Sequence, residues 1–222
     1  MSRRLVIFDC DGVLVDSERV ANRVMTHHLQ AAGLRWEYSE VCHRFTGRSM
    51  ASCVVEIESE LGRRLPVDWV EQVQQETFAA FREDLQEVPG VRRLIDVVTS
   101  RGWASCVASS GEHEKIAFTL SLTGLLDRFH GRVFSSSDVS NGKPAPDLFL
   151  HAATSMGYEP EDCWVIEDSA PGVAAARAAG MRVFGYTAGV SRNDLLEAGA
   201  EVFADMAQFA DRLSSVTEDG TS

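Results

Sequence analysis

Two carboxylates separated by one residue follow the first apolar run of the chain. Asp9 and Asp11 come directly after Leu5–Phe8, which is typical of a buried strand, and Gly12 permits a tight turn behind them. Residues two apart in an extended chain point to the same side, so these two side chains lie close together. Because neighbouring carboxylates repel unless a cation or a shared proton relieves them, the pair is a candidate for metal binding or acid–base chemistry. The alternative is an ordinary acidic strand end with a helix cap.

A second acidic pair follows another apolar run, nearer the end of the chain. Glu167 and Asp168 come after Trp164–Ile166, and an alanine-rich helical pattern begins close behind them. If this strand end lies beside the first one, three or four carboxylates converge, and such a set of oxygen ligands suits Mg²⁺. Taken alone, Asp168 or Ser169 could instead cap the helix that follows.

Two further segments carry groups that favour an anion. Ser109 and Ser110 follow Ala104–Ala108 and precede a helical pattern, where hydroxyls and backbone N–H groups favour phosphate, although such residues are also common in turns. Lys143 lies between turn residues before the next helical pattern. The chain contains one other lysine, Lys115, and we assign it no role beyond a compositional preference for arginine.

The elements that position these residues alternate between short apolar runs and helical patterns. The runs typical of buried strands are Arg4–Phe8, Ala104–Ala108, Arg132–Phe134, Trp164–Ile166, Val183–Tyr186 and Glu201–Phe203. The helical patterns between the later runs are Val91–Arg101, Glu114–Thr123, Asp147–Met156 and Gly172–Ala179. Such alternation predicts an α/β, Rossmann-like core, which is a parallel sheet covered by helices on both faces.

Residues 16–87 break this alternation. They contain three or four helical patterns and no convincing strand, the clearest patterns being Glu18–Ala32, Ser49–Leu61 and Val67–Leu85. Pro89 and Gly90 then mark a junction, after which the alternation resumes. We therefore predict an α/β core formed by residues 1–15 and 88–222, with a helical insertion formed by residues 16–87.

The composition is that of an ordinary soluble globular chain. Its 222 residues are 45% hydrophobic, and the formal net charge of −12 argues against a general binder of nucleic acid or of an acidic membrane. No apolar stretch reaches the roughly 18 residues of a membrane span. The five cysteines lack C-x-x-C spacing, which indicates a reducing, cytoplasmic location. We expect Cys10 to be a buried structural thiol, and His27 and His28 to lie on a helix surface.

Four motifs occur in one order along the chain, each where a strand is expected to end. They read FDCDGVLVDSE, VASS, GKPAPDLF and VIEDSAPGVAAARAAGM. With these motifs the chain resembles the haloacid dehalogenase superfamily over nearly its whole length. Residues 16–87 are similar to the helical cap that the family inserts after its first motif.

The resemblance implies phosphoryl transfer through an aspartyl-phosphate. Asp9 would attack the substrate phosphorus, and Asp11 would protonate the leaving alcohol and later deprotonate the attacking water. Mg²⁺ would be held by Asp9, the backbone carbonyl of Asp11 and Asp168, with Glu167 nearby. The residues that would bind the phosphoryl oxygens are Ser109, Ser110 and Lys143.

The cap of this family selects the substrate, and our candidates for that contact are Gly47 and Arg48, in the loop between two cap helices. The chain is most similar to the branch that contains β-phosphoglucomutase and small sugar-phosphate phosphatases. Two residues depart from the mutase pattern: Ala21 stands where the mutases have a histidine, and Met50 where they have an arginine for the second phosphate.

We therefore expect a Mg²⁺-dependent phosphatase of small phosphomonoesters, above all sugar or sugar-acid phosphates. The alternatives are a β-phosphoglucomutase-type phosphosugar mutase and, from a different class, a non-enzymatic phospho-receiver. The expected partner is a small phosphorylated metabolite, with neither nucleic acid nor membrane, and the expected state is a monomer or weak dimer.

Overall fold

The computed structural model describes residues 3–46, 50–187 and 189–215, and it divides the chain into two compact units. One unit consists of the residues up to Val15 together with those from Glu87 onward, and the other is Asp16–Gln86. We describe the α/β unit and the helical unit separately. No helix in the described part of the chain has the length and apolar character that crossing a membrane requires.

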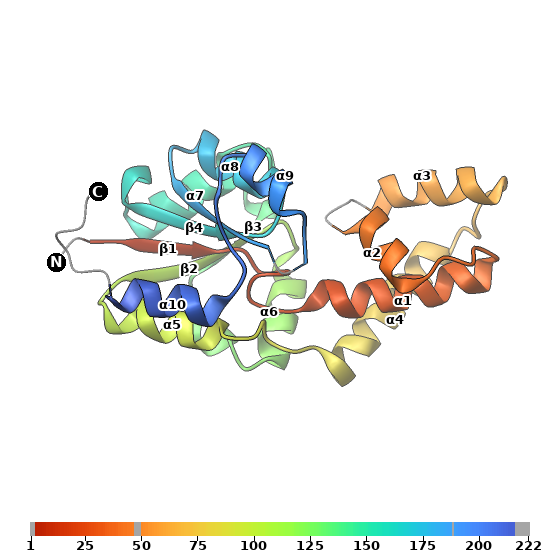
Figure 1. Cartoon of the computed structure of the whole chain (residues 1–222), viewed down its shortest axis with the longest axis horizontal. Coiled ribbons are helices and arrows are strands. Elements are labelled where there is room, and N and C mark those ends of the chain that lie inside the picture. The colour runs from red at the N-terminus through yellow and green to blue at the C-terminus, as the bar shows by residue number, and fades with distance from the viewer. Residues whose placement is uncertain (1–2, 47–49, 188, 216–222) are drawn as a thin grey trace. The chain divides into compact units, whose positions relative to one another are not determined.

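The α/β unit contains a six-stranded parallel sheet with the strand order β3-β2-β1-β4-β5-β6 (Figure 1). Its strands are β1 (Leu5–Phe8), β2 (Ala104–Ser109), β3 (Val133–Ser135), β4 (Cys163–Glu167), β5 (Arg182–Tyr186) and β6 (Glu201–Phe203). All six strands were predicted from the sequence, with ends within one residue. The α/β fold class is therefore confirmed.

The register of the sheet explains why distant motifs meet. β1 lies between β2 and β4, and Phe8 is level with Val107 on one side and with Ile166 on the other. In a parallel sheet the carboxyl ends of neighbouring strands share one edge, so the residues that follow β1, β2 and β4 come together there.

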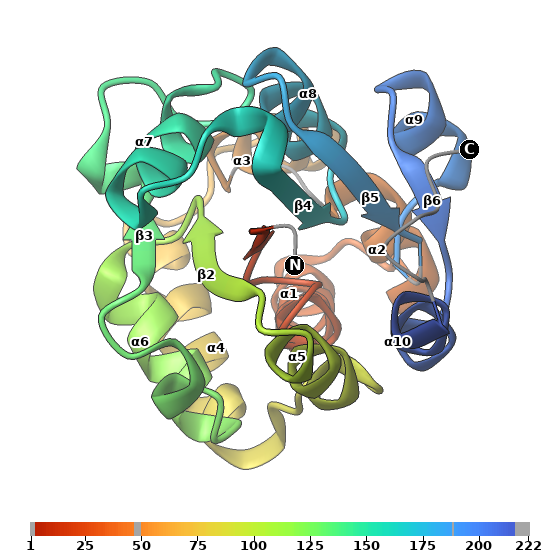
Figure 2. The same cartoon turned by 90° about the vertical axis from the view of Figure 1, so that its left-hand side faces the viewer.

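Helices cover both faces of this sheet. Figure 1 shows α7, α8 and α9 on one side and α5, α6 and α10 on the other, and Figure 2 gives the view turned by 90°. Their bounds are α5 (Val91–Ser100), α6 (His113–Leu122), α7 (Asp147–Met156), α8 (Ala170–Ala178), α9 (Arg192–Glu197) and α10 (Met206–Ser215). Single 3₁₀ turns occur at Leu126–Phe129, Ser136–Asp138 and Pro160–Asp162. The sequence patterns did not identify α9 and α10.

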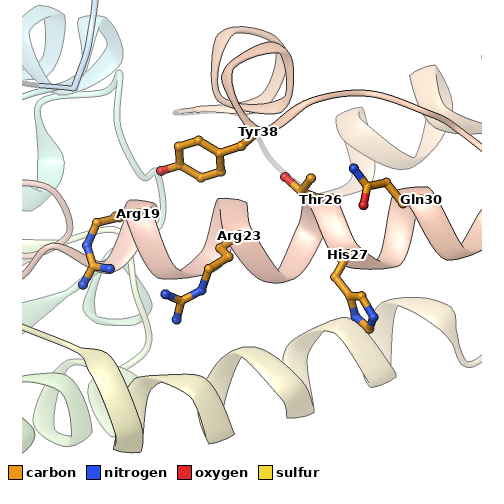
Figure 3. Close-up of a pocket in the computed structure, with 6 residues that line it drawn as sticks. All are labelled: Arg19, Arg23, Thr26, His27, Gln30 and Tyr38. Atoms are coloured by element: carbon orange, nitrogen blue, oxygen red, sulfur yellow. The ribbon is translucent and has the colours of Figure 1, made fainter.

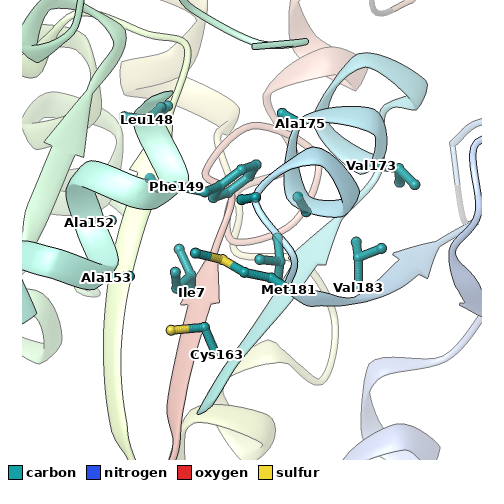
Figure 4. Packing of buried hydrophobic residues seen from close by; sticks show 14 of the residues in the cluster. Ile7, Leu148, Phe149, Ala152, Ala153, Cys163, Val173, Ala175, Met181 and Val183 are labelled. Atoms are coloured by element: carbon teal, nitrogen blue, oxygen red, sulfur yellow. The ribbon is translucent and has the colours of Figure 1, made fainter. Parts of the chain in front are cut away.

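A large apolar cluster fixes α7 and α8 against the sheet. Ile7 of β1 and Phe149 of α7 are fully buried in it, and Cys163 and Met181 fill the space toward β4 and β5 (Figure 4). Burying one large aliphatic or aromatic side chain contributes about 1.5–3 kcal/mol. This packing holds the strand ends and the first turns of the helices in place. All five cysteines, each within the described residues, are free thiols.

The helical unit consists of α1 (Ser17–Ala32), α2 (Tyr38–Phe45), α3 (Met50–Leu61) and α4 (Trp69–Asp84). Its core is formed by Met25, Leu29, Val41, Phe45, Cys53, Ile57, Trp69 and Val73. The separate helix α2 was not resolved in the sequence patterns. Its eight residues form a short helix, and one buried side of it carries Val41 and Phe45.

The surface position predicted for His28 is wrong. His28 is buried, its ring packs edge-on against Trp69, and its Nε2 lies 2.9 Å from a carboxylate oxygen of Glu76. Successive residues on a helix point about 100° apart, so His27 is exposed while His28 shares the buried side with Met25 and Leu29.

The two segments of the α/β unit pair where the helical insertion begins and ends. Val15 forms an antiparallel bridge with Glu87, and the N–H of Val88 donates to the carbonyl of Leu14 at 3.0 Å. The unit thus closes on itself across the insertion.

Candidate active site

Three carboxylates converge at the carboxyl edge of the sheet. Asp9, Glu167 and Asp168 are all buried, and each offers an oxygen within 4.8 Å of the others. The N–H of Asp9 donates to the carbonyl of Ile166 at 2.9 Å, which ties the end of β1 to β4. The side chain of Asp11 is not part of this cluster.

Two glycines make this convergence possible. Gly12 has a φ of +76°, and a Cβ there would lie 1.8 Å from Oδ2 of Asp168. A Cβ on Gly172 would lie 1.8 Å from Oε1 of Glu167. The backbone at both positions therefore approaches a carboxylate more closely than any side chain allows.

Lys143 joins the carboxylates to one another. Its ammonium donates to Oδ1 of Asp9 at 2.7 Å, to Oε1 of Glu167 at 2.6 Å and to the carbonyl of Ala108 at 3.1 Å. The side chain is only 5% exposed and lies over the ring of Phe149. This lysine is therefore a built component of the site rather than a solvated loop residue.

The burial of these charges shifts their protonation. Burial raises the pKa of Asp9 to about 7; the Lys143 charge acts against that shift, and the Glu167 carboxylate adds to it. Burial favours the neutral amine of Lys143, but the Asp9 and Glu167 charges outweigh it and raise the pKa of this lysine. The lysine therefore remains an ammonium.

Glu167 is fully buried and orders its surroundings. Its Oε2 accepts hydrogen bonds from the N–H groups of Asp168 and Ser169 and from the Ser169 hydroxyl, all at 2.9 Å. The Ser169 hydroxyl in turn accepts from the N–H of Gly172 and caps α8. The alternative interpretation of this segment as a helix cap is thus correct for Ser169, alongside the acidic cluster.

The structure places Ser109 and Ser110 at the end of β2. Ser109 is buried, and its hydroxyl oxygen accepts from the N–H of Gly111 at 3.2 Å. Ser110 is exposed, and its carbonyl accepts from the hydroxyl of Ser136. Both serines lie in the turn that leads into α6.

Sequence reasoning missed Lys115, and its assignment to mere compositional preference was wrong. Lys115 lies in the first turn of α6, and its ammonium donates to Oδ2 of Asp11 at 2.7 Å. Burial opposes the charged form of this lysine, but the Asp11 carboxylate outweighs it, so the pKa is raised. One signal was available in the sequence: a scarce residue type in a helix that begins just after Ser109.

The predicted cap residues Gly47 and Arg48 lie outside the described residues. Arg44, which precedes them in the sequence, belongs to α2, where it pairs with Glu40 and Glu56 and stacks on Trp36. Its contacts within the helical unit give it a structural role.

The helical unit also contains a hollow of about 500 Å³. Arg19 and Arg23 of α1 and Tyr38 of α2 contribute to its lining (Figure 3). The guanidinium of Arg19 binds Asp16 and Asp84, and that of Arg23 binds Asp84. Because both arginines already hold carboxylates, we do not place the chemistry in this hollow.

Cys10 is a structural thiol, as its position between two aspartates suggested. It is 1% exposed, and its sulfur lies 3.8 Å from the hydroxyl of Thr119. Burial raises the pKa of Cys10 well above its usual range, and the neighbouring carboxylates add to that shift. The thiol is therefore neutral and a poor nucleophile.

The charge balance of the carboxylate cluster fits a divalent cation. Asp9, Glu167 and Asp168 carry three negative charges when ionised, against the single positive charge of Lys143. The donors are all oxygen atoms, which suits a hard cation such as Mg²⁺. The residues present therefore fit a metal that compensates the remaining charge.

The comparison with protein families agrees with this geometry. The sequence model of the haloacid dehalogenase-like hydrolases matches residues 3–180. The chain therefore belongs to the haloacid dehalogenase-like hydrolase family.

Similar proteins narrow the class of hydrolase further. The chain is 30% identical over 210 residues to the 6-phosphogluconate phosphatase of Escherichia coli, a match covering 94% of each chain. It is 33% identical over 206 residues to a phosphorylated carbohydrates phosphatase of Thermotoga maritima, covering 88% of this chain and 91% of that one. A haloacid dehalogenase-like protein of unknown function from Agrobacterium tumefaciens superimposes with a TM-score of 0.86 at 32% identity, covering 96% and 98% of the two chains. The protein is a phosphoric monoester hydrolase.

Proposed function

We propose that the protein is a Mg²⁺-dependent phosphatase of sugar or sugar-acid phosphates that works through an aspartyl-phosphate on Asp9. The observation that carries the proposal is the position of Asp9, a buried carboxylate held by Lys143 beside two further carboxylates. The names of the Escherichia coli and Thermotoga maritima relatives support the substrate class.

In the first step a carboxylate oxygen of Asp9 attacks phosphorus, and the bond from phosphorus to the sugar oxygen breaks. Lys143 binds Oδ1 of Asp9, which leaves the other oxygen for the attack. Asp11 gives its proton to the departing sugar oxygen, so the product leaves as a neutral alcohol.

In the second step the same residue works in reverse. Asp11 takes a proton from a water molecule as the water oxygen attacks phosphorus, and the bond from phosphorus to Asp9 breaks. Inorganic phosphate leaves, and Asp9 returns as a carboxylate while Asp11 is again protonated. The overall reaction adds one water to the phosphomonoester.

The remaining residues of the site would bind the metal ion and the phosphoryl oxygens. We assign Mg²⁺ to Asp9, Asp168 and the backbone carbonyl of Asp11, where it would neutralise charge between the nucleophile and the substrate. Glu167 lies next to this position, and its four hydrogen bonds orient Lys143 and the start of α8. We assign the phosphoryl oxygens to Lys143 and to the turn with Ser109 and Ser110.

The test is phosphate release from a panel of sugar and polyol phosphates, with and without Mg²⁺. We expect Mg²⁺-dependent release concentrated on few substrates, and Asp9→Asn should abolish it while the protein stays folded. Asp96→Asn is the matched control, because Asp96 of α5 is an exposed carboxylate that pairs with Arg128. Residual activity of Asp9→Asn above about 1% would contradict a nucleophilic role, since an amide cannot replace the attacking carboxylate.

The same assay separates the alternatives. Conversion of β-glucose 1-phosphate to glucose 6-phosphate without phosphate release would establish the mutase. A single stoichiometric burst of the leaving alcohol, with the phosphoryl group retained on the protein and no further turnover, would establish a phospho-receiver.

A further inference from the structure

The chain contains two lysines, and each binds one member of the first acidic pair. Lys143 donates to Asp9, and Lys115 donates to Oδ2 of Asp11 at the same distance of 2.7 Å. Elsewhere in the sequence arginine supplies the positive side chains. Lysine offers a compact charge where arginine would offer a planar fork, so both acidic partners meet a point charge.

The Lys115–Asp11 pair is partly buried, unlike a typical surface ion pair. The side chain of Lys115 is 36% exposed and that of Asp11 is 26% exposed. Arg128 and Asp96 form a pair at the same distance of 2.7 Å on the surface of the α/β unit, with 38% and 54% exposed. The two cations are thus similarly exposed, but the Asp11 side chain is about half as exposed as that of Asp96.

The backbone of Lys115 is held in place by its neighbours in α6. Lys115 precedes Ile116, which is buried against the sheet, and the carbonyl of Lys115 accepts a hydrogen bond from the hydroxyl of Thr119. A Cβ placed on Gly111 would lie 3.6 Å from the δ-carbon of Lys115 and equally far from the hydroxyl of Ser109. The side chain therefore runs alongside the turn that we assign to the phosphoryl group.

We propose that Lys115 is a positioning residue that fixes the Asp11 carboxyl group for proton transfer. Its ammonium holds Oδ2 of Asp11 at 2.7 Å, which fixes where this carboxyl group lies when it serves the sugar oxygen and later the water. This inference rests on the proposed function, in which Asp11 is the general acid and base.

The expected loss of rate in a Lys115 variant follows from the rate that a displaced general acid loses. A positioned general acid contributes about 10²–10⁴-fold to rate, and a displacement of about 1 Å can cost about 10²-fold. We expect Lys115→Met to lower kcat for a sugar phosphate by about 10–100-fold with KM little changed, because the ammonium of Lys115 binds Asp11.

The choice of leaving group separates positioning from a general structural effect. p-Nitrophenolate departs without needing a proton, and kcat/KM reports only the steps up to formation of the aspartyl-phosphate. In Lys115→Met, kcat/KM for p-nitrophenyl phosphate should therefore fall less than about 3-fold, whereas kcat/KM for a sugar phosphate should fall about 10–100-fold. Lys115→Arg keeps a cation but replaces the compact charge with a planar fork, so it should recover part of the sugar-phosphate activity. Arg128→Met is the matched control and should leave both activities unchanged, and thermal unfolding of each variant checks the fold.

A double-mutant cycle with Asp11→Asn completes the test. If Lys115 acts through Asp11, adding Lys115→Met to Asp11→Asn lowers the sugar-phosphate rate no further. Equal losses of kcat/KM on both substrates, a change confined to KM, or additive losses in the double variant would overturn the positioning role while leaving the proposed function intact. Full sugar-phosphate turnover in Asp11→Asn would overturn both.

Discussion

Replacing Gly172 with alanine tests whether the close approach of Glu167 holds the active site together. Alanine is the better helix former, and Gly172 lies within α8, so the substitution alone should stabilise the helix by about 1 kcal/mol. The new Cβ, however, would lie 1.8 Å from Oε1 and 2.0 Å from the carboxylate carbon of Glu167. The carboxylate must move by about 1.6 Å to reach an ordinary contact of 3.4 Å.

A movement of that size breaks hydrogen bonds that the buried carboxylate cannot replace. The acceptors on Glu167 lie 2.6–2.9 Å from Lys143, Asp168 and Ser169. Each hydrogen bond to a charged group is worth about 1.5–3 kcal/mol, so losing two of them costs about 3–6 kcal/mol. After the helix gain, the net loss is about 2–5 kcal/mol, which lowers Tm by roughly 5–20 °C.

The assay is thermal unfolding together with phosphate release. Ala174→Gly, at a partly exposed position in the middle of the same helix, measures the helix propensity alone and should cost about 1 kcal/mol. We expect Gly172→Ala to lose activity as well, because Lys143 loses its anchor beside Asp9. A Gly172→Ala protein with unchanged or higher Tm and full activity would show that the Glu167 carboxylate can move without losing the hydrogen bonds that hold Lys143.

Two further predictions concern the other carboxylates. Gly12→Ala should abolish both turnover and stabilisation by Mg²⁺, since it combines a φ of +76° with a Cβ 1.8 Å from Asp168; retained Mg²⁺ binding in a calorimetric titration would contradict this. Because burial raises the pKa of Asp9 to about 7, the folded state keeps a proton that the unfolded state loses near pH 4. In EDTA, the difference in Tm between the parent protein and Asp9→Asn should therefore decrease as the pH rises from about 4 to about 7, and added Mg²⁺ should reverse this decrease. A Tm difference that does not change with pH would contradict the burial of a charged Asp9.

The strands and motifs were predictable because their signals are local. β1 is short and fully apolar, and Asp9 follows it directly in the sequence. β4 is apolar up to its last residue, Glu167, and Asp168 follows it. That Asp9 and Glu167 would meet depended only on the two strands being neighbours, which the parallel architecture favours.

The contacts that were not predicted join residues that lie far apart in the sequence. Lys115 is 104 residues from Asp11, and nothing near either residue specifies that the first turn of α6 points toward the end of β1. The burial of His28 likewise depends on α4, because Trp69 and Glu76 both belong to that helix. Helix α2 is only eight residues long, too short for a clear periodic pattern.

The bridge between Val15 and Glu87 makes the catalytic scaffold modular. The chain leaves and re-enters the α/β unit at paired positions, so a shorter, longer or unrelated insert would leave every strand with its present neighbours. Closing a longer loop costs little, about 0.6 kcal/mol for each doubling of length. Mutation can therefore remodel the inserted segment without disturbing the register that holds Asp9, and the two parts of the gene are free to evolve at different rates.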